Sequence, residues 1–276
     1  MNPSTSMPPT DPATGPVSTA SDPFVDYYAR QSLSPGTIAR FESIMDLVRR
    51  TRRAAGLGTE GLSVGDVGCN AGTQSMMWAA AGHSVRGLDI NAGLLELAGE
   101  RSREQGHDID FTLGSAADLP WETASLDVCL LPELLEHVAD WEPCLNEACR
   151  VLRTGGILYV STTNALCPKQ MEFELPLYSW YPAPLKRYCE KLSVTTHPEW
   201  VNHAKFPAVN WFTPYLLKEY LDSRGFDVYD RFDVMDLNNK SRLARQVVSA
   251  IRHLPPLRFL AHVATSYTVV VGIRRA

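Results

Sequence analysis

Residues 64–73 of the chain read Val-Gly-Asp-Val-Gly-Cys-Asn-Ala-Gly-Thr. An apolar, strand-like run ends there in a turn that carries Gly68 and Gly72, and a helical pattern follows. Small residues at a strand-to-helix turn let the backbone approach a ligand, and the helix start offers free N–H groups. The dinucleotide pattern G-x-G-x-x-G is not met, because Asn70 and Thr73 stand where it requires glycine. The stretch therefore predicts either a ligand-binding turn or a plain tight connection, and it disfavours a dehydrogenase.

Around this turn, strand-like and helix-like segments alternate along the chain. Strands are expected at residues 62–67, 84–90, 109–113, 126–131, 157–162, 226–234 and 267–273. Helices are expected at residues 73–81, 92–105, 141–152 and 214–224. Strands that alternate with helices in this way indicate right-handed βαβ units and a parallel sheet. We therefore predict an α/β fold with a mainly parallel sheet of seven strands.

The composition is typical of a soluble globular protein, with 45% hydrophobic and 21% charged residues. The formal net charge of −5 disfavours a polyanion such as nucleic acid as the main partner. The chain has no apolar run of the length that a transmembrane helix needs, and its first residues lack the pattern of a secretory signal. The six cysteines include no CxxC pair, so we expect reduced thiols and a cytoplasmic location.

The chain divides by composition into three parts. Residues 1–22 hold thirteen Pro, Ser or Thr residues and two charges, so a disordered tail is expected. Residues 23–60 are expected to form N-terminal helices, because apolar residues recur there at helical spacing. Residues 61–276 form the predicted main domain. Within it, an insertion at residues 164–212 follows the fifth strand and holds nine aromatic residues and six prolines, which is typical of a lid or substrate wall.

Asp89 ends the second predicted strand, 21 residues after Gly68. A carboxylate at this point of a βαβ unit can accept hydrogen bonds from both hydroxyls of a ribose. Alternatively, Asp89 caps the next helix, a role that Asn91 can also fill. The glycine turn and Asp89 together favour a ligand that contains a ribose.

Five motifs carry a resemblance to a known family. In order, they are DVGCNAG (66–72), GLDI (87–90), GSAADLPW (114–121), LDVCLLPELLEHV (126–138) and RVLRTGGILYVSTTN (150–164). In this order and spacing they resemble the class I S-adenosylmethionine-dependent methyltransferases. The ELLEHV segment and the TTN ending most resemble the ubiquinone-biosynthesis (quinol) O-methyltransferases. The resemblance implies a Rossmann-like fold with helices on both faces of the sheet, and S-adenosylmethionine as the cofactor.

The resemblance also implies roles for single residues. It places against the cofactor Arg40, Asp66, Gly68, Asn70, Gly72, Asp89, Ile90, Ser115, Ala116 and Leu131. Asp66 and the two glycines would cradle the amino-acid end of the cofactor, and Asp89 would bind the ribose. The Ser115–Ala116 region would meet the adenine, and Leu131 would lie under the sulfonium. Arg40 would reach the cofactor carboxylate.

Glu133, Glu136 and His137 follow the fourth strand at positions i, i+3 and i+4, a spacing that places them on one face of a helix. Three interpretations stay open. His137 could be a general base toward a substrate hydroxyl. The three side chains could instead hold Mg²⁺ or Zn²⁺, with His203 or His197 of the insertion as a further ligand. Finally, they could support the pocket without taking part in the chemistry. Three ligand-capable side chains on one helical face slightly favour the metal.

The favoured function is methyl transfer from S-adenosylmethionine to a hydroxyl oxygen of a small molecule, which is phenol-like, quinol-like or a natural product. Two alternatives remain: an RNA-terminal ribose 2′-O-methyltransferase, and a non-catalytic cofactor-binding regulatory protein. The second is motivated by Asn70 and Ser115, which depart from the family pattern.

The insertion and the C-terminal region each leave two interpretations open. The aromatic residues of the insertion could line the acceptor site or form a local core. Residues 254–262, LPPLRFLAH, suit either a peripheral membrane contact or a helix before the last strand. The sequence leaves the oligomeric state open.

Overall fold

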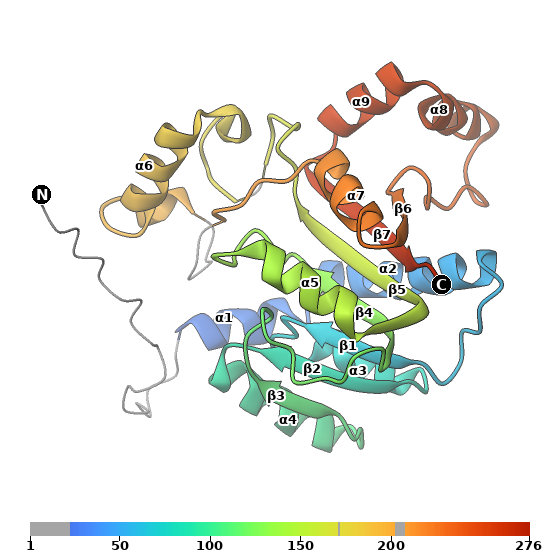
Figure 1. Cartoon of the computed structure of the whole chain (residues 1–276). Helices are drawn as coiled ribbons and strands as arrows, with labels where there is room; N and C mark the ends of the chain where they lie inside the picture. Colours follow the sequence, from blue (N-terminus) through green and yellow to red (C-terminus); the bar gives the residue numbers. More distant parts are fainter. Residues whose placement is uncertain (1–22, 171, 202–207) are drawn as a thin grey trace, which may run out of the picture.

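The computed structural model describes residues 23–170, 172–201 and 208–276 (Figure 1). Its centre is a seven-stranded sheet in the order β3-β2-β1-β4-β5-β7-β6. The strands are β1 (Ser63–Val67), β2 (Ser84–Asp89), β3 (Asp110–Leu113), β4 (Leu126–Pro132), β5 (Leu152–Thr163), β6 (Phe226–Asp230) and β7 (Tyr267–Arg274). The tail predicted at residues 1–22 lies outside the described residues.

The sheet is mixed. Strands β3, β2, β1, β4 and β5 are parallel, as predicted for most of the sheet. Strand β7 runs antiparallel to both of its neighbours, β5 and β6. Because β7 is antiparallel to β5, it begins where β5 ends: Tyr267 lies opposite Thr163. The start of β7 therefore belongs to the same edge of the sheet as the carboxyl ends of the parallel strands.

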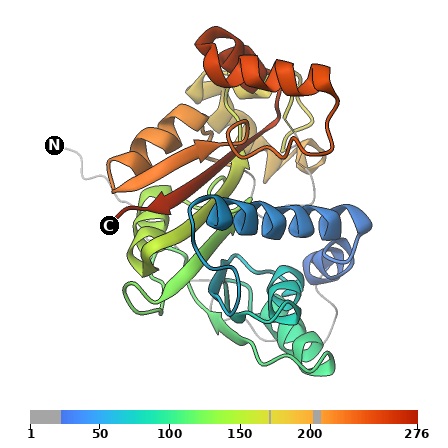
Figure 2. The same ribbon diagram turned by 90° about the vertical axis from the view of Figure 1, so that its right-hand side faces the viewer.

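Helices cover both faces of the sheet (Figures 1 and 2). They are α1 (Pro23–Gln31), α2 (Pro35–Ala54), α3 (Thr73–Ala80), α4 (Ala92–Glu104), α5 (Trp141–Val151), α6 (Ala183–Ser193), α7 (Pro214–Asp222), α8 (Arg242–His253) and α9 (Pro255–Val263). Alternate residues of β4 enter two separate cores. Val128 and Leu130 pack with Ile44 and Val48 of α2, whereas Leu131 packs on the face that α5 and α7 cover. Both faces of the sheet are therefore apolar and buried.

Strand β6 is shorter than predicted, because Asp230 folds the chain into a turn. Asp230 Oδ1 accepts a hydrogen bond from the Phe232 N–H at 2.9 Å, and Asp233 Oδ2 accepts one from the Asp230 N–H at 3.0 Å. These local bonds replace the ladder, so the strand predicted to reach residue 234 ends at residue 230. Helix α8 follows at Arg242, where the sequence analysis predicted no element. Residues 254–262 fall mainly in α9, which agrees with the helical interpretation.

The insertion carries its own small core. It contains the 3₁₀ turns η1 (Tyr178–Trp180) and η2 (Pro198–Trp200) on either side of α6. Phe173 and Tyr178 stack with their ring centroids 4.1 Å apart, and Cys189 is buried beside them. Most of the described aromatic side chains of this segment therefore pack on one another, although Trp180 and Tyr188 stay exposed. Among the helices of the described residues, none combines the length and apolar character that crossing a membrane requires.

Candidate active site

The carboxyl ends of the parallel strands meet at one edge of the sheet. Strand β1 pairs with β2 on one side and with β4 on the other, so the chain order reverses beside β1. Open α/β sheets bind their ligands in the crevice at such a switch point. The turn after β1, the end of β2 and the loop after β4 converge there, and they form the candidate active site.

Three residues with positive φ angles curl the turn after β1: Gly68 (76°), Asn70 (52°) and Gly72 (75°). Asparagine adopts this left-handed conformation more readily than most other residues, so Asn70 keeps the curl that glycine provides in the family pattern. A Cβ atom added to Gly68 would lie 3.1 Å from Leu134 Cδ1. One added to Gly72 would lie 2.8 Å from Cβ of Ala98 in α4. The glycines thus let the turn fit beneath the loop after β4 and against α4.

Asp89 is fixed directly against this turn. Its Oδ2 accepts a hydrogen bond from the Asn70 N–H at 2.8 Å, and its Oδ1 accepts one from the Asn91 N–H at 2.9 Å. Burial raises the pKa of Asp89, and the backbone donors counteract that rise. Asn91, not Asp89, caps α4, because its Oδ1 accepts from the Leu94 N–H at 3.1 Å. Asp89 is therefore held at the mouth of the turn with lone pairs left for further donors.

Asp66 lies behind the turn rather than on its surface. It is 1% exposed, and its two oxygens accept hydrogen bonds from Gln74 Nε2 at 2.9 Å and Ser75 Oγ at 2.6 Å. Burial raises its pKa to about 6. In this conformation Asp66 ties β1 to α3. The hydroxyl of Thr73, at the start of α3, has no hydrogen-bond partner among the described residues. An unpaired hydroxyl at a helix start fits a polar or anionic group of a ligand.

The other residues that the resemblance places against the cofactor are of two kinds: some lie at the rim of the site, and one is buried in the sheet core. Ile90 is 66% exposed beside Asp89, and Ser115, in the loop after β3, is also exposed. Ala116 is half-buried. An apolar and a small polar residue at this rim suit the face of a planar base. Leu131, in contrast, is fully buried in the sheet core, so it supports the site from behind and does not face a ligand.

The predicted helix at residues 133–137 is wrong. Residues 133–138 form turns, and α5 begins only at Trp141, where Asp140 caps it. Glu133 has a φ angle of 51°, which turns the chain away from a helical path. The three polar side chains consequently point to different partners. Glu133 forms an ion pair with Arg40 of α2.

Glu136 is enclosed by the protein. Its Oε2 accepts a hydrogen bond from Thr162 Oγ1 at 2.7 Å, and its Oε1 has no partner among the described residues. Burial raises the pKa of this carboxyl group to about 8. Glu136 is therefore a neutral acid at neutral pH that joins the loop after β4 to the end of β5.

His137 faces a second glutamate, which the sequence analysis did not select. Its Nε2 lies 3.9 Å from Oε2 of Glu172 in the insertion. Burial and the nearby Glu133 raise the pKa of Glu172 to about 7. An imidazole beside a carboxylate that titrates near neutrality is an arrangement suited to proton transfer. No motif marks Glu172, which stands with Glu174 on either side of Phe173 in an aromatic segment.

Two tyrosines from distant parts of the chain complete the site. Burial, Tyr27 and the carboxylates of Glu172, Glu133 and Asp89 raise the pKa of Tyr28 in α1 to about 12. Burial, together with Glu133 and Glu172, also raises the pKa of Tyr267, at the start of β7. Both phenols are therefore protonated donors near the acidic group. Helix α1 and the start of β7 place both phenols near Glu133 and Glu172, and no local pattern predicts this.

The insertion is fixed to the site through Asn210. Its Nδ2 donates to the carbonyl oxygens of Leu135 at 3.0 Å and Val138 at 2.6 Å. The hydroxyl of Thr163, at the end of β5, donates to the Asn210 carbonyl at 3.0 Å. Asn210 thereby links the insertion, the loop after β4 and the end of β5. The sequence analysis missed it, because a single asparagine before aromatic residues carries no motif.

The metal interpretation does not fit the arrangement of the acidic residues. Glu133 already forms an ion pair with Arg40, and Glu136 is buried and protonated at neutral pH. Within the described ranges, no three His, Cys, Asp or Glu side chains are grouped so that they could hold a metal ion. His203 lies outside the described residues, and His197 pairs with Glu199 at 2.8 Å. We therefore assign no chemical step to a metal ion.

Comparisons with known proteins agree with this geometry. Residues 65–160 match the family described as Methyltransferase domain. Over 106 residues the chain is 37% identical to a ubiquinone biosynthesis O-methyltransferase of Caulobacter vibrioides, a match that covers 38% of this chain and 42% of that protein. The match thus spans less than half of the relative's length.

Solved structures show the same fold. An S-adenosylmethionine-dependent methyltransferase of Methanosarcina mazei aligns with 78% of this chain and 93% of its own, at a TM-score of 0.50 and 21% identity. The geranyl diphosphate C-methyltransferase of Streptomyces coelicolor A3(2) aligns with 87% of this chain and 76% of its own, at a TM-score of 0.53 and 16% identity. The part of the chain that carries the glycine turn and Asp89, residues 65–160, therefore matches the methyltransferase domain family, and the fold around it is that of an S-adenosylmethionine-dependent methyltransferase of known structure.

Proposed function

We propose that the chain transfers a methyl group from S-adenosylmethionine to a hydroxyl oxygen of a small-molecule acceptor of the phenol, quinol or natural-product kind. The observation that carries the proposal is the pair formed by His137 and Glu172. His137 comes from the loop after β4, whose Leu134 packs against Gly68 of the glycine turn. An imidazole and a carboxylate at the donor end of a methyltransferase fold suit an acceptor that must lose a proton. The name of the Caulobacter vibrioides relative supports oxygen as the methylated atom.

When bound, S-adenosylmethionine supplies the electrophilic methyl group. The residues of the chain then have two tasks: to align the acceptor oxygen and to take its proton. His137 accepts the proton, and the Glu172 carboxylate, 3.9 Å from Nε2, stabilises the resulting imidazolium ion. The hydroxyls of Tyr28 and Tyr267, which stay protonated near these carboxylates, orient the acceptor.

The carboxylate of Glu172 gives the proposal a pH dependence. Its pKa of about 7 means that it loses its charge as the pH falls below neutrality. Without that charge the imidazolium form of His137 is less stable, so the methyl-transfer rate is expected to fall in acid. In the Glu172→Gln variant this carboxylate is absent, so the rate is lower at pH 7 and the part of the pH dependence that Glu172 contributes is lost.

The test is a methyl-transfer screen of the full chain against phenols, quinols, glycosides and short RNA. His137→Ala is expected to lower turnover by about 10²–10⁴-fold, the usual contribution of a positioned general base, while calorimetry shows cofactor affinity unchanged. His107→Ala, which removes a histidine that follows α4, is the matched control and keeps turnover.

Three outcomes contradict the proposal. Full turnover in His137→Ala removes the general base. Cofactor binding without transfer to any acceptor favours the regulatory alternative. Transfer to RNA alone favours the ribose methyltransferase.

A further inference from the structure

Helices α8 and α9 form an outer layer next to the end of β6 (Figures 1 and 2). Within the described residues they pack along each other, and neither makes a comparably extensive contact with another helix or strand. Their junction is a bend at Leu254, which is followed by Pro255 and Pro256. Each helix therefore has one side held by the protein and another side without a partner among the residues that the structure describes.

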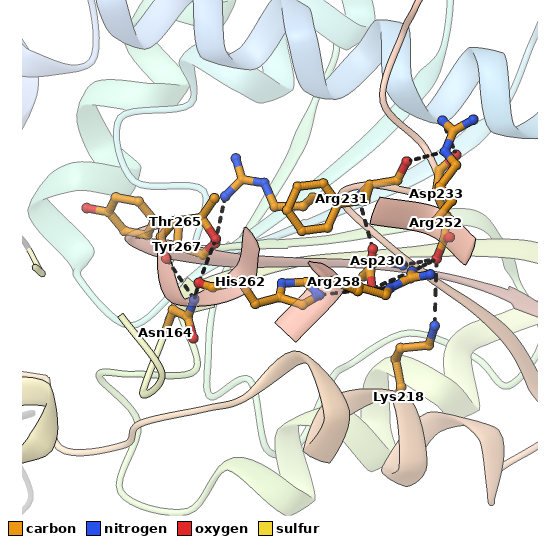
Figure 3. A network of polar contacts seen from close by, with 11 residues as sticks. Asn164, Lys218, Asp230, Arg231, Asp233, Arg252, Arg258, His262, Thr265 and Tyr267 are labelled. Atoms are coloured by element: carbon orange, nitrogen blue, oxygen red, sulfur yellow. Dashed lines mark hydrogen bonds and ion pairs between the residues drawn. The ribbon is translucent and has the colours of Figure 1, made fainter. Parts of the chain in front are cut away.

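The inner side of α9 is fixed by charge (Figure 3). Arg258 Nε donates to Asp230 Oδ2 at 2.8 Å, and His262 Nε2 lies 3.1 Å from the same oxygen. Burial alone would raise the pKa of Asp230, but the bonds from His262 and Arg258 lower it to about 2. Residues at i and i+4 share one face of a helix, so Leu260, midway between them, faces the opposite way. It is 59% exposed.

The outer sides of the two helices are apolar. On α8 and its end, Leu243, Val247 and Leu254 recur at helical spacing and are 70%, 50% and 50% exposed. On α9, Phe259 and Leu260 are exposed as well. Large exposed apolar side chains that recur along one helix face mark a surface for association with a partner. These five residues are called the apolar face of α8–α9.

The segment that forms this face carries charges of one sign. Residues 237–266 contain five Lys or Arg residues and no Asp or Glu, although the whole chain has a net charge of −5. Arg258 forms an ion pair with Asp230, and Arg252 donates to backbone carbonyls of the turn after β6. Arg245 donates to the carbonyl oxygens of Lys240 and Asn238, which leaves its charge without a carboxylate partner among the described residues. Lys240, Arg242 and Arg245 remain exposed, and none of them forms an ion pair with a described carboxylate. The outward charge of α8 is therefore positive.

We infer that the apolar face of α8–α9 docks on a membrane surface that carries anionic lipids. Apolar side chains along an amphipathic helix enter the boundary between head groups and acyl chains, while flanking cations meet the anionic head groups. The charge asymmetry of residues 237–266 selects an anionic surface over a neutral one. Helix α9 leads through Thr265 to Tyr267, so docking would also hold the candidate active site near the lipid. This inference does not depend on methyl transfer.

The experiment is co-sedimentation of the full chain with two kinds of vesicle, one of phosphatidylcholine and one of phosphatidylcholine mixed with phosphatidylglycerol. Binding to the mixed vesicles alone, weakened by salt, is expected. The double variant Arg242→Gln/Arg245→Gln should lower the partition coefficient about 25-fold, because each cation near an anionic surface contributes about fivefold. Leu243→Ser/Val247→Ser should lower it at least tenfold, since two apolar side chains no longer enter the lipid.

The matched control is Arg53→Gln/Arg103→Gln, which removes the same charge from exposed positions on α2 and α4. It should bind like the wild type, and circular dichroism should show all variants folded. The inference is overturned if the wild type does not bind the mixed vesicles, or if the α8 variants bind as the control does. It is also overturned if the α8 substitutions only dissociate a dimer or abolish binding to RNA.

Discussion

Replacing Glu136 by glutamine is expected to stabilise the protein. The side chain is fully buried and accepts one hydrogen bond, from Thr162. Burial raises its pKa from 4.5 to about 8, so at neutral pH the carboxyl group is neutral in the folded protein and ionised in the unfolded chain. Glutamine has nearly the same shape, can accept the Thr162 bond through its amide oxygen, and never ionises. It therefore removes the free energy that the unfolded chain gains by releasing the proton.

The size of the effect follows from the two pKa values. A carboxyl group whose pKa is raised by folding contributes its full stability below the unfolded pKa of 4.5 and loses it as the pH rises through about 8. At about 1.4 kcal/mol per pH unit, the interval from 4.5 to 7 corresponds to about 3 kcal/mol. The gain from Glu136→Gln should be near zero in mild acid and should approach this value at neutral pH.

Urea unfolding followed by circular dichroism at several pH values from about 5 to 8 measures this difference. Glu122→Gln, at an exposed position before β4, is the control and should change stability little at any pH. If Glu136→Gln is instead less stable than the wild type, with a deficit independent of pH, then Glu136 is ionised in the folded protein. That result would refute its assignment as a neutral structural acid and would revive the metal interpretation.

Two further predictions concern other carboxylates. Asp89→Ala should weaken S-adenosylmethionine binding, because charge-assisted hydrogen bonds are worth about 1.5–3 kcal/mol each; calorimetry with wild-type affinity would remove Asp89 from the site. Asp230→Asn should destabilise the protein at neutral pH, since Arg258 and His262 lose their anion. Folding lowers the pKa of Asp230 to about 2, so its stabilisation exists above the unfolded value of 3.8 and disappears as the pH falls toward 2. An Asp230→Asn deficit in urea unfolding that persists at low pH would contradict this.

The central strands could be predicted closely, because their residues are buried on both faces and form apolar runs. Strand β1 was predicted at residues 62–67 and is observed at Ser63–Val67. The failures lie where contacts distant in sequence decide the structure. The antiparallel position of β7 depends on β5 and β6, and α8 depends on its packing against α9. The helical spacing at residues 133–137 was misleading, because the left-handed Glu133 ends β4 in a turn.

The candidate site could be predicted only in part, for the same reason. Gly68 and Asp89 stand at strand ends whose positions follow from local patterns, and the structure brings them together. His137 was selected through a helical arrangement that does not exist, yet it reaches the same edge of the sheet. Glu172 was not selected, since it comes from the insertion and its position depends on how that segment folds back.

The residues of the candidate site lie partly inside and partly outside the range that matches the methyltransferase domain family. The turn after β1, Asp89 and His137 all lie within residues 65–160, the part that matches the methyltransferase domain family. The partner of His137, Glu172, lies outside that match, as do Tyr28 and Tyr267. The residues proposed to hold the methyl donor therefore lie in the part of the chain that matches the family, whereas Glu172, Tyr28 and Tyr267, proposed to surround the acceptor with His137, lie outside it. A relative's acceptor is consequently a poor guide to the acceptor of this chain, and the shape and charge contributed by α1, the insertion and β7 are the better guide.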